Sequence, residues 1–423
     1  MDSLSRLDVR GDAPEEDTEK AACRLEALFE LMQSDAGTEE GWATAVAEGL
    51  PQRLMATLQA SPMLPRPDSA TVGAAESASM VRLNVACLGC LFMCASVDPS
   101  CWTGIADAVP DAVAVLLERG TRALAHARVT YDDAATRGGD ATADTDGADD
   151  GADDGENSYD TAAVAAAATA EAAAQKQLVV LVFLEALLGA TEAARLALPT
   201  GRGRFNAAFL VRTVLDAVAG GGVEAVFLAA TRVALALNEQ SFTGSHKILR
   251  ELRDHPARSS VQEALLHIFN AEGFPANNDV VAAHCIHFCQ DVLEASGMED
   301  FFYVNDIKMM VDIVIRECLN RPMADKLRHE YLGLLRQVAE RSSWAAGGER
   351  HRFDDIVEML ENTLRAVALA AAPAGATADG TSGTPPLEAG TAARGPPMDV
   401  SEAVAVKVRK AAEDALAAVR QAK

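Results

Sequence analysis

The sequence predicts an all-α protein, an irregular armadillo- or HEAT-like α-solenoid with a disordered acidic insert and a flexible C-terminal tail. Apolar residues make up 49% of the chain, which is enough to build a large core, whereas aromatic residues make up only 5%. An alanine-rich chain with few aromatic residues suits closely packed helices better than sheets. Apolar side chains also recur at helical spacing in one segment after another, and no alternating strand pattern is present.

Successive helices joined by short loops form either bundles or solenoids. No motif recurs at the fixed period of tetratricopeptide or ankyrin arrays, so we expect a stack of loosely related repeats. A single globular helical domain is the alternative architecture.

We expect the solenoid to span residues 18–370, after a disordered N-terminus at 1–17. Helices are predicted at 22–31, 42–60, 80–97, 110–127, 161–190, 204–219, 223–240, 246–254, 260–271, 279–296, 305–320, 325–343 and 353–369. Pro51 divides the second of these into two helices, because proline is tolerated in the first turn of a helix.

Several helix ends carry explicit signals. Ser260 precedes Glu263 by three residues, which predicts a capping box. Asn278 and Asp279 are suited to cap the helix that follows them. Pro322 ends the preceding helix at about Asn320, since the residue before a proline is disfavoured in helical conformation.

Two segments differ in composition from the helical body. Residues 131–160 hold 11 acidic residues and one basic residue, so self-repulsion and the lack of apolar groups predict a disordered acidic insert. It is either a tolerated loop expansion or an acidic tail for a basic partner. Residues 371–397, rich in proline and glycine, predict a flexible linker to an amphipathic helix at 398–423, which docks on the protein itself or on an acidic partner.

The charge balance and the lack of targeting signals indicate a cytoplasmic protein. The formal net charge is -25, which repels nucleic acid, so no nucleic-acid partner is expected. Neither of the two most apolar windows, 178–188 and 223–237, reaches the roughly 20 uninterrupted apolar residues of a membrane span. We expect no secretory signal and no disulfide framework among the eight cysteines.

Two cysteine-containing clusters have spacings that resemble metal sites. Cys87, Cys90 and Cys94 form one stripe of a helix among apolar neighbours, which favours core packing. His284, Cys285, His287 and Cys289 are denser, but their side chains point to two faces of a helix, which favours core or boundary positions. A metal-dependent hydrolase that uses His284, His287 and a carboxylate is the weakest of three functional hypotheses.

No motif for nucleophilic, phosphate-binding or zinc-dependent catalysis is present, so the sequence indicates a protein that is not an enzyme and needs no cofactor. The three glycines at 220–222 follow no strand and precede no lysine, so they predict a turn between two helices.

The segment 301–320 (FFYVNDIKMMVDIVIRECLN) has the clearest helical pattern in the chain. An apolar stripe is formed by Ile307, Met310, Val311, Val314, Ile315, Cys318 and Leu319, and it is widened by Met309 and Ile313. The remaining face carries Lys308, Asp312 and Arg316 four residues apart, as a solvated charge ladder or part of a binding surface. A second cluster, Asn238, Glu239 and Gln240, follows an apolar helix and suits its terminal backbone groups.

Four blocks in this order resemble the leucine-rich armadillo domain of the WISH/DIP/SPIN family and its fungal relatives. The blocks are ALALNEQSF at 234–242, EALLHIFN at 263–270, FFYVNDIK at 301–308 with Asp312 and Arg316, and LRHEYLGLL at 327–335. They extend over about a third of the chain. The sequence departs from the family pattern at Val304, where many relatives have threonine.

The resemblance implies that the protein binds the actin-related protein 2/3 complex and activates it without a pre-existing filament. The activated complex then seeds linear actin filaments. Actin is then an indirect partner, and the expected location is the actin-rich cortex or endocytic patches. A passive armadillo-like adaptor of the actin cytoskeleton or endocytic machinery is the alternative. The family-motif positions, which either bind the partner or specify the fold, are Asn238, Glu239, Gln240, Phe302, Tyr303, Asn305, Asp306, Lys308, Asp312 and Arg316.

Overall fold

The computed structural model of the chain is all-helical wherever it is described. Helices and their flanking residues are described at 22–23, 25, 39–47, 49–61, 64, 74–98, 100–102, 105, 112–143, 156–194, 206–220, 222–240, 247–271, 279–344, 350–371 and 402–422. No strand occurs within these ranges, which confirms the all-α class. The chain divides into two compact units, residues 1–264 and 265–423. The armadillo-like solenoid arrangement of the whole chain stays a prediction.

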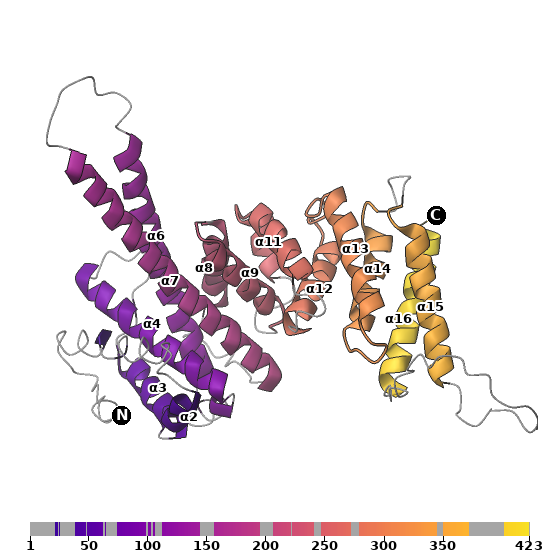
Figure 1. The fold of residues 1–423 in the computed structure, drawn as a ribbon, viewed down its shortest axis with the longest axis horizontal. Helices are drawn as coiled ribbons and strands as arrows, with labels where there is room; N and C mark the ends of the chain where they lie inside the picture. The colour runs from indigo at the N-terminus through magenta and orange to yellow at the C-terminus, as the bar shows by residue number, and fades with distance from the viewer. Residues whose placement is uncertain are drawn as a thin grey trace, which may run out of the picture. The chain divides into compact units, whose positions relative to one another are not determined.

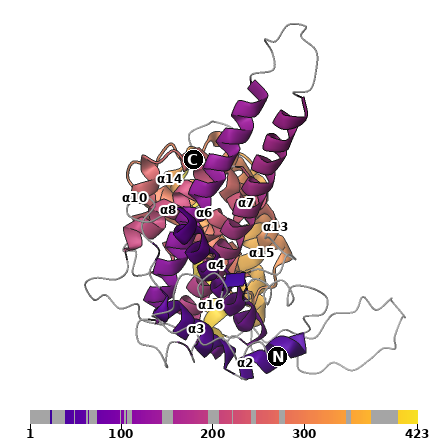
Figure 2. The same cartoon turned by 90° about the vertical axis from the view of Figure 1, so that its left-hand side faces the viewer.

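Unit 1 is centred on three long helices that pack against one another, α4 (Ala74–Val97), α6 (Ala112–Ala143) and α7 (Glu156–Ala194). Two helices pack on α4, and three more follow α7. They are α2 (Glu39–Ala47), α3 (Leu50–Ala60), α8 (Ala207–Ala219), α9 (Glu224–Asn238) and α10 (Lys247–Arg253). Helices α6 and α7 lie side by side, as Figures 1 and 2 show.

The predicted acidic insert is partly helical, which corrects its boundaries. Residues 131–143 continue α6 and residues 156–160 begin α7, so only residues 144–155 lie outside the described part of the chain. Two contacts favour the helix beyond the predicted end of α6. Arg128 pairs with Asp132 one turn later, at 3.6 Å, and Tyr131 packs against the turn at Gly222.

Two of the predicted helix ends are confirmed, and one is wrong. Pro51 stands in the first turn of α3, and α13 ends at Asn320. The capping box at Ser260 does not form a helix start, because α11 (Arg258–Ala271) already begins two residues earlier. Just before this start, the His255 ring accepts a hydrogen bond from the backbone N–H of Ala257 (3.1 Å). The N-terminus at 1–17, most of the predicted helix at 22–31, Asn278 and the linker at 372–397 lie outside the described residues.

The cysteine stripe on α4 lies in the core of unit 1, as predicted. Cys87, Cys90 and Cys94 are buried. Burial raises the pKa of Cys87 and of Cys94 to about 12, so both thiols stay protonated at neutral pH. The stripe therefore behaves as a set of small apolar side chains.

Two segments of unit 1 are long and apolar enough, by length and composition, to cross a bilayer. They are Ala78–Val97 in α4 and Ala163–Ala190 in α7, and 67% and 50% of their most apolar windows are buried inside the protein. Helices of a protein core pass the same test, so these two do not show a transmembrane segment.

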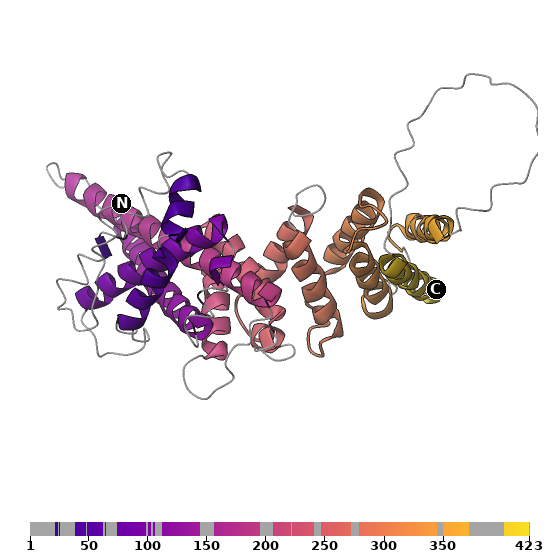
Figure 3. The same ribbon diagram turned by 90° about the horizontal axis from the view of Figure 1, so that it is seen from below.

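In the described part of unit 2, five helices follow the end of α11 and pack in two rows. One row contains α12 (Asp279–Glu294), α14 (Arg328–Arg341) and α16 (Glu402–Gln421), and the other contains α13 (Val304–Asn320) and α15 (Phe353–Ala371). Helix α16 packs on both α14 and α15, as Figures 1 and 3 show. The C-terminal helix thus docks on its own chain.

The turn between α8 and α9 contains the predicted glycines. Gly220 follows the last residue of α8, and Val223 precedes α9. The ring of Tyr131 from α6 lies so close to Gly222 that a Cβ atom at this position would overlap its hydroxyl and ring carbons. Glycine is therefore required here for a close approach of α6 to the turn.

We predict that Gly222→Ala destabilises unit 1 by about 1–3 kcal/mol, because the Tyr131 ring has to leave its place against the turn. Gly189→Ala, within α7, is the matched control, since a Cβ there meets no atom within 4 Å and alanine favours a helix by up to about 1 kcal/mol. Urea unfolding measures both. Equal effects of the two substitutions, or no relief of the Gly222→Ala penalty by Tyr131→Ala, would contradict the close approach.

Candidate partner-binding surface on α13

Helix α13 buries most of its predicted apolar stripe. Its buried apolar residues are Ile307, Met310, Val311, Ile313, Val314, Ile315 and Cys318. Two stripe residues were wrongly predicted to be buried. Met309 is 43% exposed and Leu319 is 64% exposed, because α13 packs through a narrower arc than its sequence pattern suggests.

The start of α13 is fixed by a local motif and an aromatic contact. The backbone N–H of Tyr303 donates to the Asp306 carboxylate (2.8 Å), and the backbone N–H of Asp306 donates to the Tyr303 carbonyl (3.0 Å). These reciprocal bonds satisfy donors that a helix start leaves unpaired. Phe302 is buried edge-on against Phe301, with ring centroids 5.0 Å apart. Phe302 and Asp306 thus position the helix.

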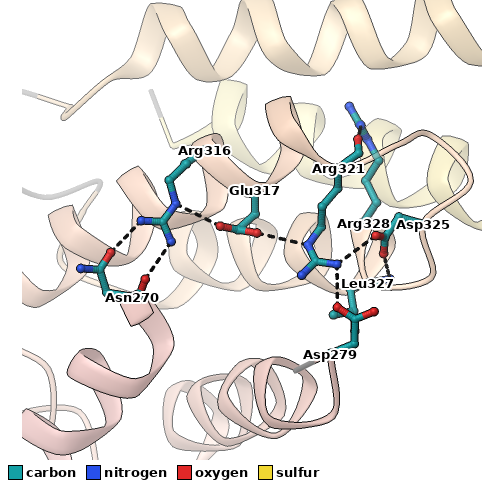
Figure 4. Close-up of polar contacts among 8 residues, drawn as sticks. All are labelled: Asn270, Asp279, Arg316, Glu317, Arg321, Asp325, Leu327 and Arg328. Carbon is teal, nitrogen blue, oxygen red and sulfur yellow. Dashed lines mark hydrogen bonds and ion pairs between the residues drawn. The ribbon is translucent and has the colours of Figure 1, made fainter. Parts of the chain in front are cut away.

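A buried ion network anchors the other end of α13 (Figure 4). Glu317, with 0% exposure, accepts hydrogen bonds from Arg316 (3.0 Å) and from Arg321 (3.2 Å). Arg321 also donates to Asp279 at the start of α12 (3.0 Å) and to Asp325 (2.9 Å). The desolvation of two buried charges is offset here by several charge-assisted hydrogen bonds.

The network continues to α14 and α15 through Arg328. Its guanidinium donates to the Arg321 carbonyl (2.6 Å) and to the Thr363 hydroxyl on α15 (3.1 Å). Burial lowers the pKa of Arg328. Burial also acts to lower the pKa of Arg321, but hydrogen bonds with Asp279 and Asp325 outweigh it and hold that pKa above its usual range. The carboxylates of Asp279 and Asp325 therefore favour the charged form of Arg321.

Two further contacts link the family blocks to one another. Arg316 donates to the Asn270 side chain (2.7 Å) and to its carbonyl (3.2 Å) at the end of α11. The buried Tyr331 ring on α14 stacks on Phe269 with centroids 6.0 Å apart, and the Arg321 guanidinium lies 5.6 Å from its centroid. The blocks at 263–270, 301–316 and 327–335 therefore contact one another in unit 2.

The predicted charge ladder on α13 pairs with other partners instead. Asp312 lies 2.9 Å from the His351 ring nitrogen and 3.6 Å from Arg352, in the segment that precedes α15. Arg316 pairs with Glu317 and Asn270, as described above. Both side chains thus help to hold unit 2 together, whatever else they contact.

The remaining motif residues, Tyr303, Asn305 and Lys308, form an exposed surface with Val304 and Met309 at the N-terminal half of α13. We call this surface the α13 patch, and its residues are Tyr303, Val304, Asn305, Lys308 and Met309. Tyr303 is 67% exposed and Val304 56% exposed, which is unusual for large apolar side chains close together. An exposed aromatic ring, two apolar side chains and a lysine are suited to contact another protein.

The three motif residues at the end of α9 belong to unit 1. The Gln240 backbone N–H donates to the Leu237 carbonyl (3.2 Å). Its buried side chain donates to the carbonyls of Leu188 (3.3 Å) and Ala236 (3.5 Å). Gln240 thus satisfies backbone groups at the helix end, as its sequence position suggested. Asn238 and Glu239 lie beside it, half-exposed.

The histidine and cysteine turn on α12 does not assemble a metal site in the described part of the chain. His284, Cys285 and Cys289 are buried, whereas His287 lies near the surface with its Nε2 atom 3.7 Å from the Glu330 carboxylate. No group of three or more His, Cys, Asp or Glu side chains converges among the described residues. Burial raises the pKa of Cys289 above its usual range, so this thiol is protonated.

The most consequential residues of unit 2 were missed by the sequence analysis. Glu317 and Arg321 were not singled out, and Arg328 was noted only as part of a block. Their one local signal is the spacing of Glu317 and Arg321, four residues apart, with the glutamate beside the apolar stripe.

This arrangement defines an all-helical, leucine-rich domain whose sequence blocks hold its helices together. Residues 224–356 match the family described as SPIN90/Ldb17, leucine-rich domain. The chain is also 27% identical over 137 residues to Protein LDB17 of Eremothecium gossypii, a match that covers 31% of this chain and 29% of that protein. Residues 224–356 are therefore similar to the SPIN90/Ldb17 leucine-rich domain, which confirms the resemblance drawn from the four blocks.

We predict that Glu317→Ala destabilises unit 2 by about 3–5 kcal/mol, because Arg321 is left buried with one carboxylate fewer. Glu413→Ala is the control, since Glu413 forms the same kind of pair with Arg409, four residues apart at 2.9 Å, but on the surface. It should cost less than about 0.5 kcal/mol. Thermal unfolding followed by circular dichroism compares the two, and similar losses would contradict a special role for the buried pair.

Proposed function

We propose that this protein is a cytoplasmic adaptor that binds the actin-related protein 2/3 complex and activates it without a pre-existing filament, so that it seeds linear actin filaments at the cortex or at endocytic patches. The observation that supports this proposal is the family match over residues 224–356, which includes all of α13. The resemblance of the four blocks implies this activity for the family.

The α13 patch is the part of the matched region that we assign to the partner. The other motif residues on α13 are occupied inside unit 2, since Phe302 is buried, Asp306 caps the helix, and Asp312 and Arg316 form ion pairs. The patch residues Tyr303, Val304, Lys308 and Met309 remain exposed. Their aromatic and apolar surface supplies contact area, and Lys308 supplies charge complementarity to an acidic site.

Activation in this proposal is a population shift. A partner that binds the active arrangement of a complex more tightly than the inactive one moves the equilibrium by that difference in affinity, and a shift from 1:99 to 99:1 requires a difference of about 10⁴-fold. A binding surface that deforms to fit both arrangements loses part of this difference in affinity. The buried network behind α13 favours a stiff surface.

A passive adaptor is the second candidate, because family membership supports an adaptor role without the activation step. The two candidates differ in one measurement. Purified protein that accelerates pyrene-actin assembly, in the presence of the actin-related protein 2/3 complex and without filament seeds, is an activator. A protein that binds the complex without acceleration is an adaptor.

We predict that Lys308→Glu combined with Met309→Ala weakens binding to the complex at least about tenfold, because the pair reverses a charge and removes an apolar side chain in the patch. Binding is measured by titration of labelled complex, and assembly by pyrene fluorescence.

The matched control is Lys326→Glu, an exposed lysine in the connection between α13 and α14, beyond the opposite end of α13. It changes the net charge equally and should leave affinity within about twofold. Equal losses for both variants would indicate a general charge effect, and unchanged affinity in the first variant would remove the α13 patch from the interface.

A further inference from the structure

A groove of about 410 Å³ lies between α14 and α16 in unit 2. From α14 it is lined by His329, Gly333 and Arg336. From α16 it is lined by Lys407, Lys410, Ala411 and Asp414. The groove belongs neither to the α13 patch nor to the buried ion network.

Two of the lining residues are small. Gly333 has no side chain and Ala411 has one carbon, so neither places a long side chain in the groove. The lining residues lie within eight-residue stretches of each helix, from 329 to 336 and from 407 to 414, and seven steps along a helix correspond to roughly 10 Å. The floor of the groove is thus short, contains small residues and is open to solvent.

Several cationic side chains line the groove, although the chain as a whole has a formal net charge of -25. Lys407 and Lys410 are exposed and Arg336 is half-exposed, and the described residues offer none of the three an ion pair. His329 is engaged, since its Nε2 atom lies 3.1 Å from Glu330. A hydrogen bond from His287 lowers the pKa of Glu330, and the charges of His329 and Lys407 lower it further, so this carboxylate is ionised beside the groove.

The rim of the groove carries three cationic side chains that form no ion pair with a described residue, Arg336, Lys407 and Lys410. It carries two carboxylates, Asp414 and Glu330. Glu330 is already shared with His287 and His329. The groove therefore keeps a positive excess, directed at a concave surface rather than spread along a helix. Clefts with charge of one sign concentrate ligands of the opposite sign.

We propose that this groove binds an acidic segment of a partner protein, rich in aspartate or glutamate. A floor of roughly 10 Å accommodates about three residues of an extended peptide, at 3.3 Å each. Arg336, Lys407 and Lys410 then face carboxylates on successive residues. The open form of the groove suits a peptide that passes over it.

The site exists only while α16 is docked, since four of its seven lining residues come from that helix. Docking is maintained by small buried side chains, Val408, Ala412, Ala415 and Val419, and by one exposed ion pair between Arg420 and Glu361 (2.9 Å). A ligand that binds only the docked form stabilises that form. Acidic peptide binding and α16 docking are therefore coupled.

Fluorescence anisotropy with the full chain and a labelled peptide Gly-Ser-Glu-Asp-Glu-Asp-Glu-Ser-Gly tests the proposal. Lys410→Glu should weaken binding about tenfold, because it reverses a charge at the groove. Arg409→Glu is the matched control, since Arg409 is the adjacent exposed residue on α16, lies outside the groove and carries the same charge. It should change affinity by less than about twofold. Equal losses for the two variants would overturn the site.

A second variant tests the dependence on α16. Ala415→Glu places a charge in the buried face of α16 and should undock it, which abolishes peptide binding without unfolding the other helices. In the unsubstituted chain, the peptide should increase the protection of α16 amides against hydrogen exchange. Retained affinity in the undocked variant, or unchanged protection, would overturn the coupling.

The identity of the ligand is tested separately. Inositol hexakisphosphate and anionic vesicles should compete only weakly with the peptide. Tight binding of either one, with the same dependence on Lys410, would replace the acidic peptide by a phosphate ligand. Lys410→Glu should leave binding to the actin-related protein 2/3 complex unchanged, so failure of this proposal and failure of the proposed function are distinguishable.

Discussion

The architecture of unit 2 depends on the buried ion pair between Glu317 and Arg321. A buried carboxylate and guanidinium are costly to desolvate, so they are tolerated only where further hydrogen bonds complete their shells. Here Asp279 and Asp325 complete the shell of Arg321, and Arg328 extends the contacts to Thr363. The network connects α12, α13, α14 and α15. Misplacement of any one of these helices would leave a buried charge without a partner.

This constraint separates the family-motif residues into two groups. Arg316 contacts Asn270, and Tyr331 stacks on Phe269, so these residues join neighbouring blocks inside unit 2. Tyr303 and Lys308 contact solvent in the described structure. The sequence motif thus contains two kinds of residue, some that hold the helices together inside unit 2 and others that are exposed.

The sequence predicts what depends on local pattern and fails where partners are distant. Helical spacing predicts the buried stripe of α13, and Pro322 predicts its end. The burial of Glu317 could not be predicted, since one of the side chains of its network, Asp279, lies 42 residues from Arg321 along the chain. Similarly, α6 continues to Ala143, into the predicted acidic insert, and its Tyr131 meets the turn at Gly222, a contact that composition does not reveal.

The two surfaces of unit 2 differ in the way they are supported, and this difference bears on their use. The α13 patch is carried by a helix whose far end is held by buried charges, which favours a constant geometry of the patch. A constant geometry is what a differential preference for one arrangement of a partner requires. The groove beside α16 rests instead on small apolar side chains and one surface ion pair. In our proposal, a ligand at the groove therefore acts on the C-terminal helix and not on the surface of α13.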